Sequence, residues 1–293
     1  MLLAAIAAAA LLAACHATRG IRVDSPVTAQ VTYAEPRGRY DLYHVRLQAE
    51  GETATGRLLH PRRAERRLPA VLLNDGRELN SAALDYLPPD FGDVVVLSLD
   101  YPEALPDEFD GLTMLLDSDD IRRELRRIPR LFSLGAAYLA QRADVDPSRL
   151  ALVVTSFAVP FGVRAAAEDS RFRNVGLIYG AGDLPRVLEA NLELEPRFLR
   201  ALAADLADQL YGEFEPTRYV EAIAPRPLVM VNGRNDPQMP VEAVRALYAA
   251  AREPKALVWL TTGHLLPTDR RLIRELVDTT LARLPVLDRV RPR

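Results

Sequence analysis

Short, uninterrupted apolar runs recur along most of the chain, and they constrain the fold more than any other feature. Strands that are buried on both faces have this composition, which is typical of a parallel sheet. Segments of helical periodicity separate most of the runs. Strands that alternate with helices in this way predict an α/β domain with helices on both faces of the sheet. The runs are AVLLN (70–74), VVVLSL (94–99), LALVV (150–154), VGLIY (175–179), LVMVN (228–232) and ALVWL (256–260).

The predicted helices have recognisable ends. Ser118 begins a long segment that continues through residue 142, and the acidic residues after it suit the positive end of a helix. Pro129 lies inside this segment, and we expect it to kink or split the helix. Two further helices are predicted over residues 240–254 and 269–284.

Two regions depart from this alternation. The segments 29–35, 40–50 and 53–61 alternate apolar and polar residues, which predicts half-buried antiparallel strands before the parallel sheet. Residues 184–222 form helices by composition and are too long for an ordinary connection. We interpret this stretch as a small helical cap inserted in the domain. The alternative is one more packing helix with no role at a functional site.

The chain begins with MLLAAIAAAALLAAC, an apolar segment that is too short to span a bilayer. It is typical of an export signal, and LAAC resembles the lipobox of bacterial lipoproteins, in which the cysteine is lipidated. Cys15 is the only cysteine, so no disulfide forms within the chain. We therefore expect a signal peptide (1–14), a tether (15–29) and one folded α/β domain (30–285). An ordinary signal with an incidental Cys15 is the alternative.

This interpretation places the protein in the bacterial cell envelope, on the periplasmic side or at the outer membrane, with acyl chains on Cys15 as the membrane contact. A formal charge of −3 gives no signature of nucleic-acid binding. The acidic residues of 106–120 have the spacing of no metal-binding loop, so we expect neither metal nor cofactor. The basic run 62–67 is interpreted as a solvated turn, with attraction to anionic lipids as a secondary alternative.

Ser156 marks the first candidate for chemistry. The apolar run 150–154 leads into it, and a predicted helix with Pro160 in its first turn follows. This strand–turn–helix layout is that of a nucleophile elbow, which exposes a serine hydroxyl above a sheet. Val154 and Ala158 stand where such elbows normally carry glycine. Ala158 is small, whereas the bulk of Val154 is expected to oppose the close approach of strand and helix.

Two other residues follow predicted parallel strands. Asp236 lies in the loop after Asn232 and Gly233, although Asn-Asp-Pro is also an ordinary turn sequence. His264 follows the last strand directly after a glycine. Sites of open α/β sheets lie at the carboxyl ends of the strands, which favours this histidine over His16, His44 and His60.

The chain order Ser156, Asp236, His264 resembles that of the α/β-hydrolases. Residues 226–264 are similar to the C-terminal part of the dienelactone-hydrolase and acyl-esterase branch. The resemblance covers about residues 30–285. It implies an α/β-hydrolase fold and hydrolysis of a small ester, thioester or amide substrate, with Ser156 as nucleophile, His264 as base and Asp236 orienting the histidine.

The resemblance also implies an oxyanion hole of two backbone N–H groups, one of them from Phe157. The other is expected from Gly76 or Arg77, in a loop where the family usually has His-Gly and this chain has Asn74-Asp75. A charge on Asp75 would oppose a developing oxyanion.

These departures leave a rival hypothesis open, a non-catalytic hydrolase-like lipoprotein with a binding or scaffold role. A small serine peptidase is the second alternative. About 50 residues lie between the expected signal peptide and the first predicted parallel strand, too few for the propeller that prolyl-oligopeptidase-type enzymes carry.

Overall fold

A computed structural model of the chain describes residues 20–63, 66–76, 79–88, 92–106, 116–192, 197–265 and 269–285. Its strands form one nine-stranded sheet in the order β1-β2-β3-β5-β4-β6-β7-β8-β9. The strands are β1 (Thr28–Arg37), β2 (Tyr40–Ala49), β3 (Glu52–Pro61), β4 (Leu68–Asn74), β5 (Val95–Leu99), β6 (Val145–Thr155), β7 (Asn174–Ile178), β8 (Leu228–Gly233) and β9 (Lys255–Leu260).

The sheet is mixed, as the sequence predicts. Strands β1, β2 and β3 form an antiparallel meander whose last strand pairs antiparallel with β5. All pairs from β5 to β9 across the sheet are parallel. The carboxyl ends of β4, β6, β8 and β9 therefore lie at one edge, where residues from distant parts of the sequence meet.

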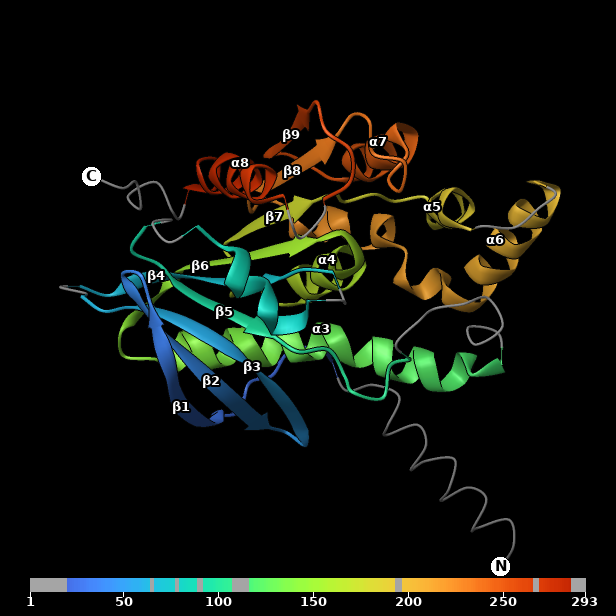
Figure 1. The fold of residues 1–293 in the computed structure, drawn as a ribbon. Coiled ribbons are helices and arrows are strands. Elements are labelled where there is room, and N and C mark those ends of the chain that lie inside the picture. Colours follow the sequence, from blue (N-terminus) through green and yellow to red (C-terminus); the bar gives the residue numbers. More distant parts are fainter. Residues whose placement is uncertain are drawn as a thin grey trace, which may run out of the picture.

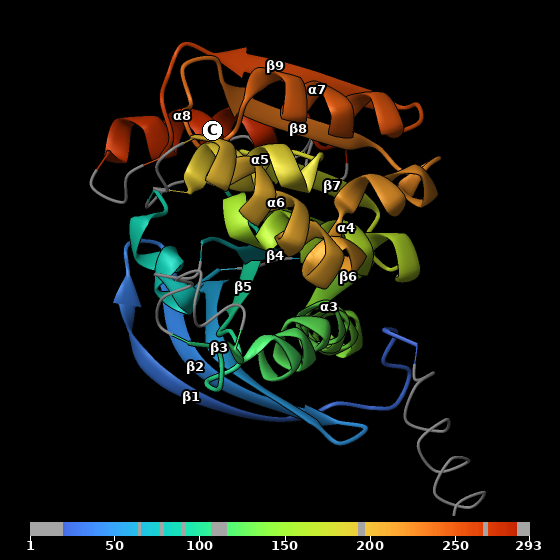
Figure 2. The same ribbon diagram turned by 90° about the vertical axis from the view of Figure 1, so that its right-hand side faces the viewer.

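Helices cover both faces of this sheet (Figures 1 and 2). On one face, α3, α4 and α7 share one buried apolar cluster with the strands, and η1 and α8 share a second cluster on the other face. The helices are η1 (Asn80–Tyr86), α3 (Ser118–Gln141), η2 (Ser156–Ala158), α4 (Val159–Glu168), α5 (Leu184–Asn191), α6 (Arg197–Tyr211), η3 (Gly212–Phe214), η4 (Pro216–Arg218), η5 (Val220–Ile223), α7 (Val241–Ala250) and α8 (Arg270–Leu281).

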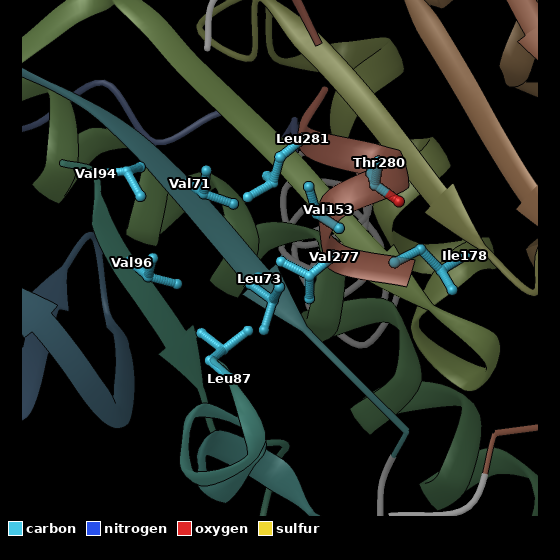
Figure 3. Close-up of a pocket in the computed structure, with 10 residues that line it drawn as sticks. All are labelled: Val71, Leu73, Leu87, Val94, Val96, Val153, Ile178, Val277, Thr280 and Leu281. Carbon is cyan, nitrogen blue, oxygen red and sulfur yellow. The ribbon is translucent and has the colours of Figure 1, made fainter. Parts of the chain in front are cut away.

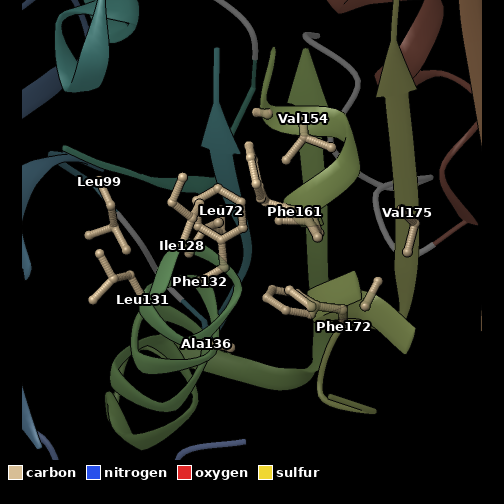
Figure 4. Close-up of a cluster of buried hydrophobic side chains, with 14 of the residues drawn as sticks. Leu72, Leu99, Ile128, Leu131, Phe132, Ala136, Val154, Phe161, Phe172 and Val175 are labelled. Carbon is tan, nitrogen blue, oxygen red and sulfur yellow. The ribbon is translucent and has the colours of Figure 1, made fainter. Parts of the chain in front are cut away.

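Strand β6 shows why the apolar runs are uninterrupted. Leu150, Leu152 and Val154 belong to the cluster under α3 and α4, which Figure 4 shows in part. Ala151 and Val153 belong to the cluster under α8. Both faces of the strand are buried, so both alternating positions are apolar.

The second face is closely packed beneath α8. A Cβ on Gly176 of β7 would lie 2.8 Å from Cγ2 of Thr280. The glycine therefore allows α8 to pack closely against β7. A cavity of about 20 Å³ remains between β4, β6 and α8, lined almost wholly by valine, leucine and isoleucine (Figure 3). An apolar space of this size is expected to stay dry.

Two local details differ from expectation. Helix α3 continues from Ser118 to Gln141 through the buried Pro129, so the proline does not split it. The apolar flank of α3 packs along the sheet on both sides of that proline, which holds the helix together. Strand β6 begins at Val145 rather than Leu150, with a register irregularity opposite Leu68 and Ala70.

The segment 20–27 lies along α3. The Arg130 guanidinium donates to the carbonyl of Gly20, and Ser133 Oγ accepts from the N–H of Val23. The backbone N–H groups of Ser25 and its predecessor, with Arg130, hold the pKa of the Glu50 carboxyl at about 2. Within the described ranges, no helix has both the length and the apolar character that a membrane span requires.

Candidate active site

Ser156 lies directly after β6, in the turn that leads through η2 into α4. Its backbone is left-handed, with a φ of 51°. This conformation is costly for a residue other than glycine, and it is the conformation that presents a nucleophile at a strand-to-helix turn. Pro160 lies in the first turn of α4, where its missing N–H leaves no helical bond unmade.

Val154 is accommodated by a glycine on the facing helix. A Cβ on Gly162 of α4 would lie 2.6 Å and 2.7 Å from the two Cγ atoms of Val154, so the valine methyl groups fill the space beside that glycine. Figure 4 shows Val154 on β6 beside the ribbon of α4. The close approach that a glycine before the serine normally provides is supplied here from the helix side. Ala158, after the serine, is fully buried.

The structure brings the three residues of the predicted set together. Ser156 Oγ lies 3.2 Å from Nε2 of His264, and Nδ1 of His264 lies 2.7 Å from Oδ2 of Asp236. With an ionised Asp236, Nδ1 carries the proton and donates to the carboxylate, which leaves Nε2 to accept from the serine hydroxyl.

Asp236 is held by its own loop. Its carboxyl group is wholly buried, and Oδ1 accepts from the backbone N–H groups of Gln238 at 2.8 Å and Met239 at 3.2 Å. Each carboxylate oxygen therefore has a hydrogen-bonding partner, and these bonds hold the side chain in one conformation. A buried carboxylate so fixed can orient the imidazole of His264 and stabilise its protonated form.

The loops after β8 and β9 are locked to one another. The N–H of Asn235 donates to the carbonyl of Thr262 at 3.0 Å. A Cβ on Gly233 would lie 2.6 Å from the same carbonyl oxygen, so only glycine permits this approach. Asp236 and His264 are thus positioned by the contact between their two loops.

Tyr179, the residue after β7, supports the histidine. Its ring centroid lies 4.8 Å from that of His264, and its hydroxyl contacts Oγ1 of Thr262 at 3.3 Å. Burial raises the pKa of the Tyr179 hydroxyl, which keeps the ring neutral beside the histidine. The backbone of Tyr179 is left-handed, with a φ of 52°, directly after β7 ends.

The loop after β4 lies beside the elbow. Asn74 pairs with Val154 across the sheet, so Gly76 and Ser156 each follow a paired position by two residues. The Asn74 amide bonds to both peptide groups of Leu99, accepting from its N–H and donating to its carbonyl. The backbone of Gly76 is not in the left-handed region, and a Cβ there would meet no atom of the described residues within 4 Å, its chain neighbours aside.

Tyr101 connects this loop to the elbow. Its hydroxyl donates to the carbonyl of Asp75, while its ring packs edge-on against Phe157 with centroids 5.4 Å apart. Burial, and then the nearby charge of Asp75, raise the pKa of Tyr101 far above the ordinary range. The hydroxyl therefore stays protonated and acts as a donor to the loop.

An apolar cavity of about 370 Å³ opens beside Ser156, a volume in the range of small-ligand sites. It lies between the first turns of α4, the helix α5 and the loop after Asp236. The residues that line it are Leu125, Ser156, Phe157, Val159, Pro160, Phe161, Ala181, Leu184, Val187, Leu188, Asn191, Leu192, Tyr211, Phe214, Pro216, Gln238 and Met239.

The other residues singled out in the sequence fall elsewhere. His44 and His60 lie on β2 and β3, away from the parallel strand ends, while Cys15 and Arg77 lie outside the described residues. Sequence reasoning missed Gly162, Tyr101 and Tyr179, because each acts through a contact that no local motif contains. In the part of the chain that the structure describes, no three His, Cys, Asp or Glu side chains are grouped as metal ligands.

Comparison with known proteins identifies the fold. No protein-family model matches the chain. The acetyl xylan esterase of Paenibacillus sp. R4 superposes with a TM-score of 0.61 at 17% identity, covering 87% of this chain and 90% of that one. Acetyl xylan esterase 1 of Thermoanaerobacterium sp. JW/SL YS485 gives 0.60 at 16% identity, covering 86% and 89%.

Peptidases share the same fold. The acylaminoacyl peptidase of Pyrococcus horikoshii gives a TM-score of 0.58 at 12% identity, covering 87% of this chain but 42% of that one. In sequence, the chain is 25% identical over 126 residues to the uncharacterized protein YfhR of Salmonella typhi, a match that spans 43% of each chain. At these identities the solved structures establish the α/β-hydrolase fold alone.

Proposed function

We propose that the protein is a serine hydrolase that cleaves an ester, thioester or related acyl substrate. In this proposal Ser156 is the nucleophile, His264 the general base and Asp236 the group that orients the histidine. The observation that carries the proposal is the continuous contact from Ser156 Oγ through both ring nitrogens of His264 to Asp236, with the serine at a positive φ.

The geometry supports a two-stage reaction. Ser156 Oγ attacks the carbonyl carbon of the substrate while its proton passes to Nε2 of His264. The negative oxygen that forms accepts hydrogen bonds from the backbone N–H groups of Phe157 and Gly76. As the bond to the leaving group breaks, that group takes the proton from Nε2. Water then attacks the acyl-serine by the same route, releasing the acid and restoring the hydroxyl.

The fold comparisons favour esters as the substrate. Solved structures of similar fold and similar length include acetyl xylan esterases, whereas the similar peptidase is more than twice as long as the region that this chain matches.

The direct test is hydrolysis of p-nitrophenyl esters by the wild type and by Ser156→Ala. We expect kcat/KM to fall at least about 10⁴-fold, because the nucleophile of the triad is removed. Ser170→Ala is a matched control, since Ser170 is an exposed serine whose Oγ accepts from the Arg22 guanidinium, away from the candidate site. Equal turnover by both variants would contradict Ser156 as the nucleophile, and no turnover by the wild type would leave the non-catalytic scaffold as the function.

We also propose that the protein is exported and anchored to the bacterial envelope through acyl chains on Cys15. The proposal is supported by the apolar segment that ends in LAAC and by the absence of any second cysteine from the sequence. Labelling of cells with a palmitate analogue should tag the wild type and not Cys15→Ser. Equal labelling of the two proteins would contradict this anchoring.

A further inference from the structure

We propose that the substrate carries an uncharged, apolar chain next to its scissile bond, and that this chain lies in the cavity between α4 and α5. The inference rests on the proposed hydrolase function, and it names the substrate class of that site. The cavity reaches Ser156 itself, so a group bound in it is attached to, or one atom from, the reacting carbonyl.

The chemistry of the lining carries the first step. Among the described residues that line the cavity, none is acidic, basic or histidine, and the polar side chains are Ser156, Asn191, Tyr211 and Gln238. The Asn191 amide donates to the carbonyls of Val187 and Gln238, which satisfies its N–H groups. A carboxylate or phosphate inside this cavity would lose water without gaining a cationic partner.

Aromatic rings give the cavity its depth. Phe157 contacts Phe161, whose ring contacts Phe214, with centroid separations of 5.3 Å and 5.6 Å. Tyr211 continues the series beyond Phe214 at 6.5 Å. The wall therefore extends from the residue after the nucleophile to η3, much farther than an acetyl group reaches.

Helix α5 supplies the opposite wall. Leu184, Val187 and Leu188 lie on one face of the helix by their spacing, and all three line the cavity. None of the α5 residues is fully buried. An apolar helix face that is only partly covered by protein, and that borders a reactive serine, is suited to cover an apolar ligand.

Burial of the apolar chain of the substrate sets the expected change in kcat/KM. Transfer of one methylene from water to an apolar site is worth ~0.8 kcal/mol, or about fourfold in kcat/KM. We therefore expect kcat/KM to rise from acetyl to hexanoyl esters by about fourfold per methylene at most. The rise should stop when the cavity is filled.

The experiment uses two series of esters with the full-length protein. One series varies the acyl group of p-nitrophenyl esters from acetyl to decanoyl, and the other varies the alkyl group of acetate esters. A rise in one series identifies whether the acyl or the alcohol part occupies the cavity. A p-nitrophenyl ester of monomethyl adipate and its free-acid counterpart test charge; we expect the free acid to react at least about 100-fold more slowly.

Two tryptophan variants on α5 locate the effect. Leu188→Trp fills the cavity and should lower the ratio of hexanoyl to acetyl kcat/KM at least about tenfold. Ala190→Trp adds the same bulk to an exposed residue of the same helix that does not line the cavity, and should leave that ratio unchanged.

The outcomes separate this inference from the proposed function. Ester turnover that depends on Ser156, with a flat or falling response in both series, would overturn the apolar-chain inference and leave the hydrolase intact. The same holds if Leu188→Trp and Ala190→Trp behave alike. No Ser156-dependent turnover of any ester would overturn both proposals.

Discussion

The two sides of Ser156 both lack a motif that α/β-hydrolases usually carry, but they are secured by different forces. On the elbow side, between β6 and α4, apolar packing sets the geometry: Val154 fills the space beside Gly162. On the side of the loop after β4, hydrogen bonds do so: Asn74 bonds to the Leu99 peptide groups, and Tyr101 donates to Asp75.

The two sides therefore accept different kinds of substitution. Packing of two surfaces can be kept when bulk moves from one to the other, so a glycine missing from the strand is replaced by one on the helix. A hydrogen bond needs its particular partner, so the loop depends on two particular side chains, Asn74 at the end of β4 and Tyr101 after β5. At the elbow, a second substitution that restores the packing should therefore compensate for the first. In the loop, a single substitution that removes a hydrogen-bonding group should be sufficient to impair the site.

The largest expected effect is that of Gly162→Ala. The new methyl group would meet the branched Val154 side chain, which has little freedom to move, and we expect a loss of about 1–3 kcal/mol in unfolding free energy. In a Val154→Ala background the sign should reverse, with a gain of up to ~1 kcal/mol from helix propensity. Urea unfolding of the double-mutant cycle measures the coupling. Equal effects in both backgrounds would show that the two residues do not compensate.

A smaller effect is expected for Tyr101→Phe, which tests the loop. The ring against Phe157 remains, but the bond to the Asp75 carbonyl is lost, so the loop that carries Gly76 is less well positioned. We expect kcat to fall about tenfold with little change in KM, equivalent to ~1.4 kcal/mol in the transition state. The exposed Tyr33 provides a control as Tyr33→Phe. A rise in KM with unchanged kcat would place the role of Tyr101 in substrate binding instead.

The smallest effect is expected for Gly76→Ala. Among the described residues, and its chain neighbours aside, no atom lies within 4 Å of the added methyl group, and the backbone is not left-handed, so the unfolding free energy should change by less than ~0.5 kcal/mol. Thermal unfolding of this variant and of Gly162→Ala is the measurement. It compares a glycine with open space around an added Cβ with a glycine where a neighbouring side chain fills that space. A loss as large as that of Gly162→Ala would end the contrast between the two sides.

Much of the fold could be predicted from the sequence because the burial of a strand determines the pattern of apolar residues along it. The six continuous apolar runs became β4 to β9, and the three alternating segments became the antiparallel meander. The start of β6 could not be predicted, since the polar residues 146–149 belong to the strand only through a register irregularity, where Ser148 donates to the Asp146 carboxylate. The continuity of α3 through Pro129 also depends on packing against the sheet, which no local rule contains.

The candidate site could be predicted in part. Ser156, Asp236 and His264 each follow a strand, and parallel strands bring their carboxyl ends together, so their order and position in the sequence were sufficient. The compensation by Gly162 was not predictable, because which helix residue faces Val154 depends on how α4 docks. The same applies to Tyr101 and Tyr179, whose roles arise from side-chain contacts across neighbouring strands.

The central claim is that an elbow without its usual glycines still presents Ser156 as a working nucleophile. Reaction of the folded protein with a fluorophosphonate probe, followed by mass spectrometry of the digested chain, tests it most directly. We expect one adduct, on Ser156, that is lost when His264→Ala removes the base. Absence of any adduct, under conditions that fully label a known serine hydrolase, would contradict it.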